Sequence, residues 1–479
     1  MAEDFIRVQT QLHLSNEEFH LVPFEYITTE FERLTREISA ERSIPVPEED
    51  LLAIHRLNIE QKAAFDLIYD AALSGKGGVY FVDGPGGTGK SFLYKVLLAH
   101  IRSKGYIGLI VASSGIAASN FLGGRTAHSR FKIPIDGGPN VKSLLSFQSS
   151  EAELIRTSKI IIWDEAPMAD KSIIEALNNL LQELCENKLI FGGRLVVFGG
   201  DFRQVLPVVP RGTRKEQVEA SVVTCTLWNH FIKLRLTDNM RARDDPGFIN
   251  FLMRIGNGEE PTNDNGKIAI PRPMLIPYTS VEQSLELLIA YVYPQMEMFQ
   301  SDPFEMMKRT ILCPKNEFVD DINHRLIDRL QGNQVVNINP VEGLCNGTRL
   351  ICKILLPNVV GAIIAIGQFR GKHVSIPKIP LEPNPSDSKY LIPFIRRQIP
   401  VRLCFAITIN KSQGQTLDYV GLYLKQPVFS HGQLYVGLSR AKSGKNVKVL
   451  IIPPTCSDPG TEYTTNVVYN EVLTKANLS

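Results

Sequence analysis

The segment Gly84-Pro85-Gly86-Gly87-Thr88-Gly89-Lys90-Ser91 has the composition of a phosphate-binding loop. Its glycines let backbone N–H groups close around a phosphate, because they carry no Cβ that would collide with it. Lys90 can reach the β- and γ-phosphates of a nucleotide, and the Ser91 hydroxyl can ligate Mg²⁺. The segment therefore predicts that the chain binds ATP together with Mg²⁺.

Two acids and an amide further along could complete a hydrolytic site. Asp164 and Glu165 follow an apolar run; Asp164 would hold Mg²⁺ and Glu165 would polarise the attacking water. Paired acids also cap helices, but a position downstream of a phosphate loop favours the catalytic interpretation. Gln204 is the predicted γ-phosphate sensor, because ligands bind at the carboxyl ends of parallel strands. The alternative is a turn amide that bonds its own backbone.

Gln61 has two interpretations that spacing alone leaves even. With Asn58 three residues earlier it predicts a capping box at a helix start. Its amide could instead read an adenine edge upstream of the phosphate loop. With that second interpretation, the predicted nucleotide-binding residues are Gln61, Gly84, Gly86, Gly87, Thr88, Gly89, Lys90 and Ser91.

A second polar group follows a predicted strand and could contact nucleic acid. It contains Arg125, His128, Arg130 and Phe131. Cations that bind backbone phosphates beside an aromatic ring that stacks on bases are typical of a single-strand track. The alternative is a loop whose Phe121 and Phe131 pack inward, and each residue taken alone favours that alternative.

The elements that must position these residues are apolar strands that alternate with helices. The first set is predicted at Val79–Val82, Ile107–Ala112, Lys159–Trp163 and Arg194–Phe198. Such alternation predicts a doubly wound α/β domain. A second α/β unit is predicted from the strand Thr310–Cys313, the helix Glu317–Leu330, a strand at Leu403–Thr408 and a last strand at Val447–Ile452.

A change of pattern interrupts the second unit. Short β-rich runs at Leu350–Leu355, Gly361–Ile366 and His373–Ile376 are broken by turns and prolines, which predicts a small β insertion. The predicted domains are a polar lead-in at 1–52, a first lobe at 53–235, a second lobe at 236–343 and 399–479, and the insertion at 344–398.

Composition bounds the class of protein. The chain has 479 residues, a hydrophobic content of 44% and a formal net charge of +2, so nucleic acid would need a local basic groove. Seven scattered cysteines without a C-x-x-C pair argue against a disulfide framework and a zinc site. We expect no signal peptide and no membrane span, and an intracellular protein.

Taken in order, these motifs resemble those of superfamily-one helicases of the Pif type (petite integration frequency), in particular the plant and helitron-like branch. The match covers roughly residues 55–455. Besides the two nucleotide motifs, the resemblance includes Gly199–Pro207 as a sensor loop. It also includes Asn239-Met240-Arg241, Tyr435–Ala441 and Lys411-Ser412-Gln413-Gly414.

The resemblance implies two RecA-like lobes with ATP between them, a wedge insertion within 125–150 and an SH3-like insertion in the second lobe. It implies that Lys90, Glu165, Gln204, Arg241 and Arg440 are catalytic, the two arginines reaching the γ-phosphate from the second lobe. It implies DNA contacts by Lys411, Ser412 and Gln413.

The resulting hypothesis is an ATP- and Mg²⁺-dependent 5′→3′ DNA helicase, monomeric and nuclear, that acts on single strands and duplex junctions. It would serve DNA repair, recombination or telomere maintenance. One alternative is an ATPase or translocase that does not unwind duplexes and is directed to RNA. Another is a transposon-derived DNA-binding protein, which the full set of catalytic residues disfavours.

Overall fold

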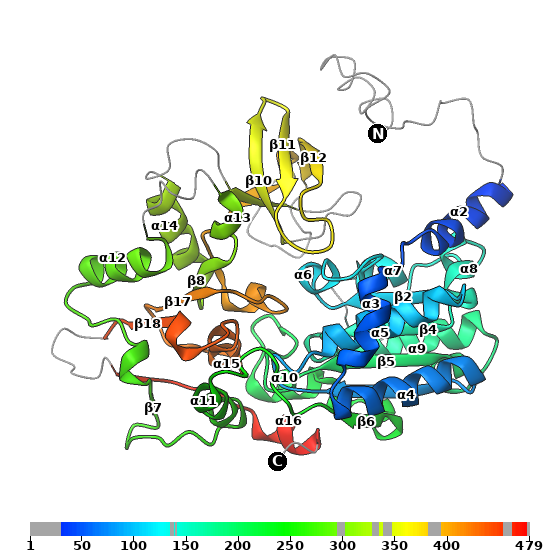
Figure 1. The fold of residues 1–479 in the computed structure, drawn as a ribbon, viewed down its shortest axis with the longest axis horizontal. Helices are drawn as coiled ribbons and strands as arrows, with labels where there is room; N and C mark the ends of the chain where they lie inside the picture. The colour runs from blue at the N-terminus through cyan, green and yellow to red at the C-terminus, as the bar shows by residue number, and fades with distance from the viewer. Residues whose placement is uncertain are drawn as a thin grey trace.

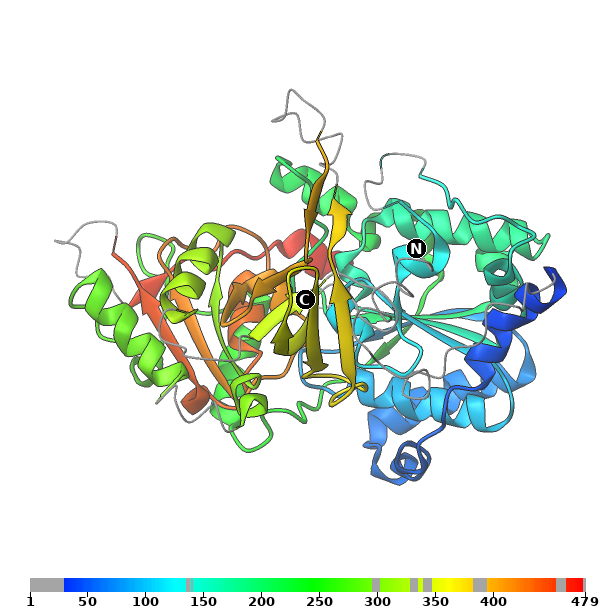
Figure 2. The same cartoon turned by 90° about the horizontal axis from the view of Figure 1, so that it is seen from above.

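The computed structural model describes residues 30–134, 138, 141–294, 302–327, 335–338, 347–381, 394–453 and 462–476. Two α/β lobes lie side by side, the first on the right of Figure 1 and the second on the left. A smaller β insertion stands above them, and seen from above it lies over the line where the lobes meet (Figure 2). The fold is therefore α/β with two RecA-like lobes, as the sequence predicts.

The first lobe is built on a parallel sheet of six strands in the order β3-β2-β4-β5-β1-β6. In β1, Tyr80 and Val82 face the hydrophobic cluster that includes α4 and α5, while Val79 and Phe81 face the cluster that includes α9. Successive side chains of a strand point to opposite faces, which is why a continuous apolar run forms a strand covered on both sides. The bounds are β1 Gly78–Asp83, β2 Gly108–Ala112, β3 Arg125–Thr126, β4 Ile160–Asp164, β5 Leu195–Gly200, β6 Ile232–Arg235, α4 Ile59–Ser74, α5 Lys90–Ser103, α6 Gly115–Ala118, α7 Ala127–Phe131, α8 Ser150–Thr157, α9 Lys171–Leu184 and α10 Arg214–Ala220.

The second lobe has a parallel sheet of four strands in the order β16-β8-β17-β18. Its helices share one large hydrophobic cluster with this sheet. The bounds are α11 Pro246–Asn257, β7 Ile268–Ala269, α12 Val281–Val292, α13 Pro303–Met306, β8 Arg309–Cys313, α14 Asn316–Ile327, β16 Ala406–Thr408, β17 Tyr419–Leu424, α15 Gln433–Leu438, β18 Val447–Ile451 and β19 Tyr463–Thr464. The helix that follows, α16 Asn470–Lys475, packs on the first lobe.

The insertion is a separate antiparallel sheet of five strands in the order β12-β11-β10-β9-β15. Its members are β9 Val335–Ile338, β10 Thr348–Leu355, β11 Val359–Ile364, β12 His373–Pro377 and β15 Val401–Leu403, with a side hairpin of β13 Ile379–Leu381 and β14 Arg396–Gln398. The sheet thus extends beyond the predicted bounds of 344–398 at both ends. The predicted strand at Leu403–Thr408 is two strands in two sheets, because β15 pairs with β9 and β16 pairs with β8.

Two segments assigned to the second lobe are attached to the first. Leu236 N–H donates to Asp83 O at 2.8 Å directly after β6. At the other end of the chain, α16 packs into the hydrophobic cluster of the first lobe, and Trp228 Nε1 donates to Lys475 O at 3.2 Å. The predicted second-lobe ranges are corrected accordingly: the chain crosses between the lobes once near residue 241 and again before residue 469.

The predicted lead-in is partly described. Helices α2 Glu30–Arg42 and α3 Glu48–Leu52 pack on the first lobe, and residues 1–29 lie outside the described residues. Glu41 of α2 is buried and pairs with Arg130 of α7. No helix in the described ranges is long and apolar enough to cross a membrane.

Candidate nucleotide-hydrolysis site

A cavity of about 810 Å³ lies between the two lobes. The first lobe contributes the phosphate loop, Asp164, Glu165 and Gln204 to its lining. The second lobe contributes the segment 414–417 and Arg440. Residues far apart in the sequence thus meet around one space of the size of a ligand pocket.

The phosphate loop joins the end of β1 to the start of α5. Gly87 and Gly89 have positive φ angles of +102° and +82°, which L side chains rarely adopt, so glycine is required there. Lys90 is buried, and its Nζ donates to the carbonyl of Gly84 and, at 3.4 Å, to that of Pro85. The lysine therefore lies along the loop, with its charge at the start of α5 where phosphate binds.

Gln61 forms the capping box that its spacing predicts. Its backbone N–H donates to Asn58 Oδ1 at 2.8 Å, and its Oε1 accepts the N–H of Asn58 at 3.1 Å. Its Nε2 also donates to Thr88 O at 2.9 Å, so the side chain supports the phosphate loop directly. These bonds use the amide oxygen and one of the two amide hydrogens; recognition of adenine stays a prediction that depends on the second hydrogen.

Asp164 and Glu165 stand at the end of β4, and both are buried. Ser91 Oγ donates to Asp164 Oδ2 at 3.4 Å, which brings the two predicted Mg²⁺ ligands together. Burial, and next the neighbouring Glu165, raise the pKa of Asp164 to about 7. A divalent cation at this carboxylate would relieve that cost. One carboxylate and one hydroxyl fit Mg²⁺, which takes its other ligands from phosphate and water.

Glu165 has an unusual backbone conformation, and its side chain contacts a residue of the second lobe. Its φ of 54° lies in the left-handed region, where a non-glycine residue is strained. Its Oε2 accepts a hydrogen bond from Gln413 Nε2 at 2.8 Å. The resemblance implies that Gln413 contacts DNA, whereas the structure buries its side chain against Glu165. The sequence motifs do not predict this contact, because it joins two residues that are 248 positions apart in the chain.

Gln204 is buried beside the cavity, as a sensor requires. Its Nε2 donates to Asp201 Oδ2 at 3.4 Å, and its Oε1 is buried without a hydrogen-bond partner. Buried amide oxygens are normally satisfied, so this atom marks a polar position that a ligand or water would complete.

Two arginines come together at the phosphate loop. Arg241 Nη1 donates to Ser439 O at 2.8 Å, and Arg440 Nη2 donates to Ser439 Oγ at 2.8 Å. Burial, and next the charge of Arg440, lower the pKa of Arg241 to about 9. Two cations held together in a partly dry cavity favour an anion between them, which suits a transferring phosphoryl group.

The two arginines reach this place by different routes. Arg440 follows α15 of the second lobe. Arg241 was assigned to the same lobe, but the backbone before it is bound to the phosphate loop. Met240 N–H donates to Gly87 O at 2.9 Å, and Asn239 Nδ2 donates to Gly86 O at 3.1 Å. Arg241 is therefore tied to the first lobe, and only Arg440 is carried by an element of the second.

The predicted single-strand track of the first lobe is largely internal. Phe131 is fully buried beside Trp163, and Phe121 is buried as well. Arg130 is 1% exposed and pairs with Glu41. The assignment of Arg130 and Phe131 to DNA is wrong for this structure, because neither side chain can reach a strand without leaving the core.

Arg125 and His128 are half-buried at the margin of that core. Arg125 pairs with Glu37 at 3.5 Å, and a ring nitrogen of His128 lies 3.0 Å from Ile133 O. In the second lobe, Ser412 is fully buried and donates to Ile409 O, which excludes it from a DNA surface, whereas Lys411 is exposed. Arg125, His128 and Lys411 remain predictions for strand contact.

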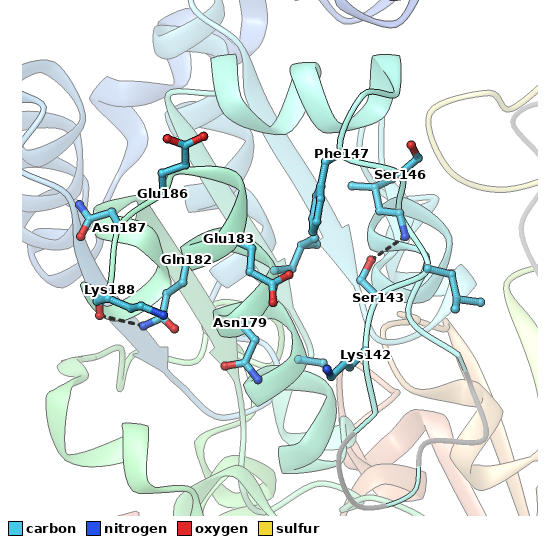
Figure 3. Close-up of a pocket in the computed structure, with 14 residues that line it drawn as sticks. Lys142, Ser143, Ser146, Phe147, Asn179, Gln182, Glu183, Glu186, Asn187 and Lys188 are labelled. Carbon is cyan, nitrogen blue, oxygen red and sulfur yellow. Dashed lines mark hydrogen bonds between the residues drawn. The ribbon is translucent and has the colours of Figure 1, made fainter.

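A second cavity, also of about 810 Å³, lies on the first lobe away from the lobe boundary. Figure 3 shows Asn179 and Glu183 of α9 on the side of the segment with Lys142 and Phe147, whereas Gln182 points to Lys188. It contains no residue of the phosphate loop and no predicted catalytic residue. The chemistry therefore belongs to the cavity between the lobes.

Comparison with known proteins agrees with this geometry. The PIF1-like helicase family model matches residues 56–266. The ATP-dependent DNA helicase Pif1 of Bdellovibrio bacteriovorus is 27% identical over 423 residues, which cover 84% of this chain and 89% of that protein. The ATP-dependent DNA helicase PIF1 of Danio rerio is 29% identical over 428 residues, covering 83% of this chain and 62% of that protein.

Two solved structures have the same fold. Pif1 helicase from Bacteroides in complex with ADP-AlF3 and single-stranded DNA has a TM-score of 0.62 at 23% identity, over 83% of this chain and 94% of that one. A Pif1 structure described for DNA unwinding at forked duplex DNA has a TM-score of 0.61 at 25% identity, with the same coverage. The matches extend across both lobes. The chain spans nearly the whole bacterial relative but less than two thirds of the fish protein.

Proposed function

We propose that this chain is an ATP-dependent DNA helicase of the Pif type, which moves along single-stranded DNA and separates the duplex ahead of it. The observation that carries the proposal is the contact between Gln413 and Glu165, because a group of the second lobe there touches the proposed catalytic base of the first. The two relatives described above match more than four fifths of this chain and are both named ATP-dependent DNA helicases, which supports the same function.

Hydrolysis follows from the positions of the cavity residues. Glu165 is the base that orients and deprotonates the attacking water, and its strained backbone fixes the direction of its carboxylate. Lys90, Arg241 and Arg440 surround the position of the γ-phosphate with positive charge, which stabilises the charge that develops during transfer. We propose Ser91 and Asp164 as the holders of Mg²⁺, which would supply charge neutralisation at the phosphates.

Movement requires that the state of the nucleotide reaches the DNA. Lys411 is exposed two residues from Gln413, within one short 3-10 turn and its exit. A change at Glu165 that shifts Gln413 therefore also shifts a cation on the surface. We propose that this segment links hydrolysis to strand contact, with Lys411 binding backbone phosphate.

Several finer assignments belong to the same proposal. We propose DNA rather than RNA as the track, 5′→3′ as the direction, and duplex junctions as the substrate, with repair, recombination or telomere maintenance as the setting. The resemblance of the motifs to the plant and helitron-like branch supports a nuclear enzyme, and the cavity is completed by one chain, which supports a monomer.

A strand-displacement assay tests the function. Duplexes with a 5′ tail, a 3′ tail or an RNA tail are mixed with protein, ATP and Mg²⁺. We expect separation of the 5′-tailed DNA only, and none with the Glu165→Gln variant. Nucleic-acid-stimulated hydrolysis without separation of any duplex would favour a translocase instead.

A further inference from the structure

A tyrosine of the second lobe reaches into the phosphate loop. Tyr435 lies on α15 and is 2% exposed. Its hydroxyl accepts the N–H of Gly86 at 2.9 Å and donates to Asp201 Oδ2 at 2.9 Å. One hydroxyl group therefore joins the phosphate loop, the loop after β5 and the helix that precedes Arg440.

Asp201 is the centre of this arrangement and is fully buried. Its Oδ2 also accepts the N–H of Gly86 at 3.1 Å and the Nε2 of Gln204 at 3.4 Å, and its Oδ1 accepts the N–H of Arg203 at 3.0 Å. A buried carboxylate depends on such bonds, because it has lost its water. The position of the Gln204 side chain is thus linked to the group that bonds Tyr435.

The same helix holds the arginine. Arg440 Nε donates to Val436 O at 2.9 Å, the carbonyl of the residue next to Tyr435. Arg440 Nη2 lies 3.4 Å from the position that a Cβ on Gly86 would occupy. A shift of α15 relative to Gly86 therefore displaces the guanidinium from the phosphate loop by a similar amount.

A second contact keeps the sensor loop against the second lobe. His431 Nε2 donates to Phe202 O at 2.7 Å, and its Nδ1 accepts the N–H of Tyr469 at 2.8 Å. Gly432 follows with φ +71°, and a Cβ there would lie 2.3 Å from Arg203 O. The segment 431–435 and the loop 201–204 therefore pack without space between their backbones.

We propose that Tyr435 is a positioning residue, which joins the sensor loop and the Arg440 segment into one unit so that Gln204 and Arg440 approach the γ-phosphate together. This inference rests on the proposed ATPase. It assigns the hydroxyl a role in rate rather than in nucleotide affinity, because Gly86 keeps Asp201 as a partner when the hydroxyl is removed.

The test is the Tyr435→Phe variant, which removes that hydroxyl alone. Steady-state ATP hydrolysis is measured with and without a saturating single-stranded oligonucleotide. We expect the DNA-stimulated kcat to fall about 10- to 100-fold, the range for loss of a hydrogen bond to a charged group. The KM for ATP should change by less than about threefold.

Tyr293→Phe is the matched control. Tyr293 is a buried second-lobe tyrosine whose hydroxyl donates to Phe405 O at 2.6 Å within that lobe. It should retain DNA-stimulated kcat while losing a comparable hydrogen bond. Equal losses in both variants, or a Tyr435→Phe enzyme with wild-type stimulated kcat, would overturn the proposal.

A double-mutant cycle tests the route through the carboxylate. If Tyr435 acts through Asp201, the loss in Tyr435→Phe/Asp201→Asn should not exceed the larger of the two single losses. Additive losses would mean that the two residues act separately, and the proposal would fail. A wild-type enzyme without DNA-stimulated hydrolysis would refute the proposed function instead, so the two failures are distinguishable.

Discussion

The cleft between the lobes and the segment 125–131 of the first lobe both gather cations beside the end of a strand. In the cleft, the structure brings Lys90, Arg241 and Arg440 to one cavity, and among the described residues none of the three forms a salt bridge within 4.0 Å, although Asp164 and Glu165 line the same cavity. At 125–131, the cation Arg130 lies in the core with its own counter-ion, Glu41. The two sites differ in the partner of each cation. Arg130 forms a buried ion pair with Glu41, which indicates a structural role. Arg241 and Arg440 instead lie close enough to repel each other, so a bound anion would be stabilised between them.

The largest effect that this comparison predicts is at the two arginines of the cleft. Arg440→Ala should lower DNA-stimulated hydrolysis by ~10³–10⁵, the contribution of a positioned arginine finger. The affinity for nucleotide should stay within a modest factor, because Lys90 and the loop amides remain. Steady-state ATPase with and without a single-stranded oligonucleotide measures both. If the variant remained fully stimulated by DNA, the finger would be misassigned.

The proposed catalytic base, Glu165, should give the next effect. Glu165→Gln keeps the size of the side chain but removes the base, so hydrolysis should slow by ~10²–10⁴ while ATP still binds.

Lys90→Ala should also abolish turnover and leave DNA binding intact, because the lysine bonds the phosphate loop. Binding of a fluorescent nucleotide and of a labelled strand separates these effects. Wild-type hydrolysis in either variant would contradict the site.

The sequence predicts the features that depend on local motifs, and it does not predict those that depend on how distant segments pack. The phosphate loop and Asp164-Glu165 are short motifs whose backbone conformation fixes the chemistry, so spacing suffices to place them. Gln413 shows the limit, because its contact with Glu165 depends on how two lobes pack. Single side chains such as Arg130 carry no such backbone signature, and the helix that buries it lies far upstream. The return of α16 to the first lobe is likewise a packing event that local pattern does not encode.

A substitution at Arg130 tests whether this residue stabilises the core and does not bind DNA. Arg130→Met removes the nearer partner of the buried Glu41 and leaves it only the longer contact with Arg102 Nη2 at 3.9 Å, which should destabilise the protein by up to about 3–5 kcal/mol. Denaturant unfolding of the first-lobe transition measures this. The affinity of the folded variant for single-stranded DNA, and its salt dependence, should equal those of wild type. A variant that kept its stability but lost DNA affinity would restore the surface interpretation.

The smallest effect separates the exposed cations that remain candidates for strand contact. Lys411 is exposed, with Asn316 Oδ1 3.5 Å from its Nζ, whereas Arg125 already has Glu37 as a partner. A cation that binds a DNA phosphate releases about one counter-ion, so its loss lowers the log–log salt slope of binding by roughly one or less. Lys411→Gln should therefore flatten the slope, and Arg125→Gln should change it less, because the arginine has to leave Glu37 before it can bind phosphate.

The measurement is the dissociation constant for a labelled single strand across a salt series, at constant protein stability. Equal slopes for Lys411→Gln and wild type would remove Lys411 from the strand path. A larger change for Arg125→Gln would show that the margin of the first lobe, and not the turn beside Gln413, carries the stronger contact.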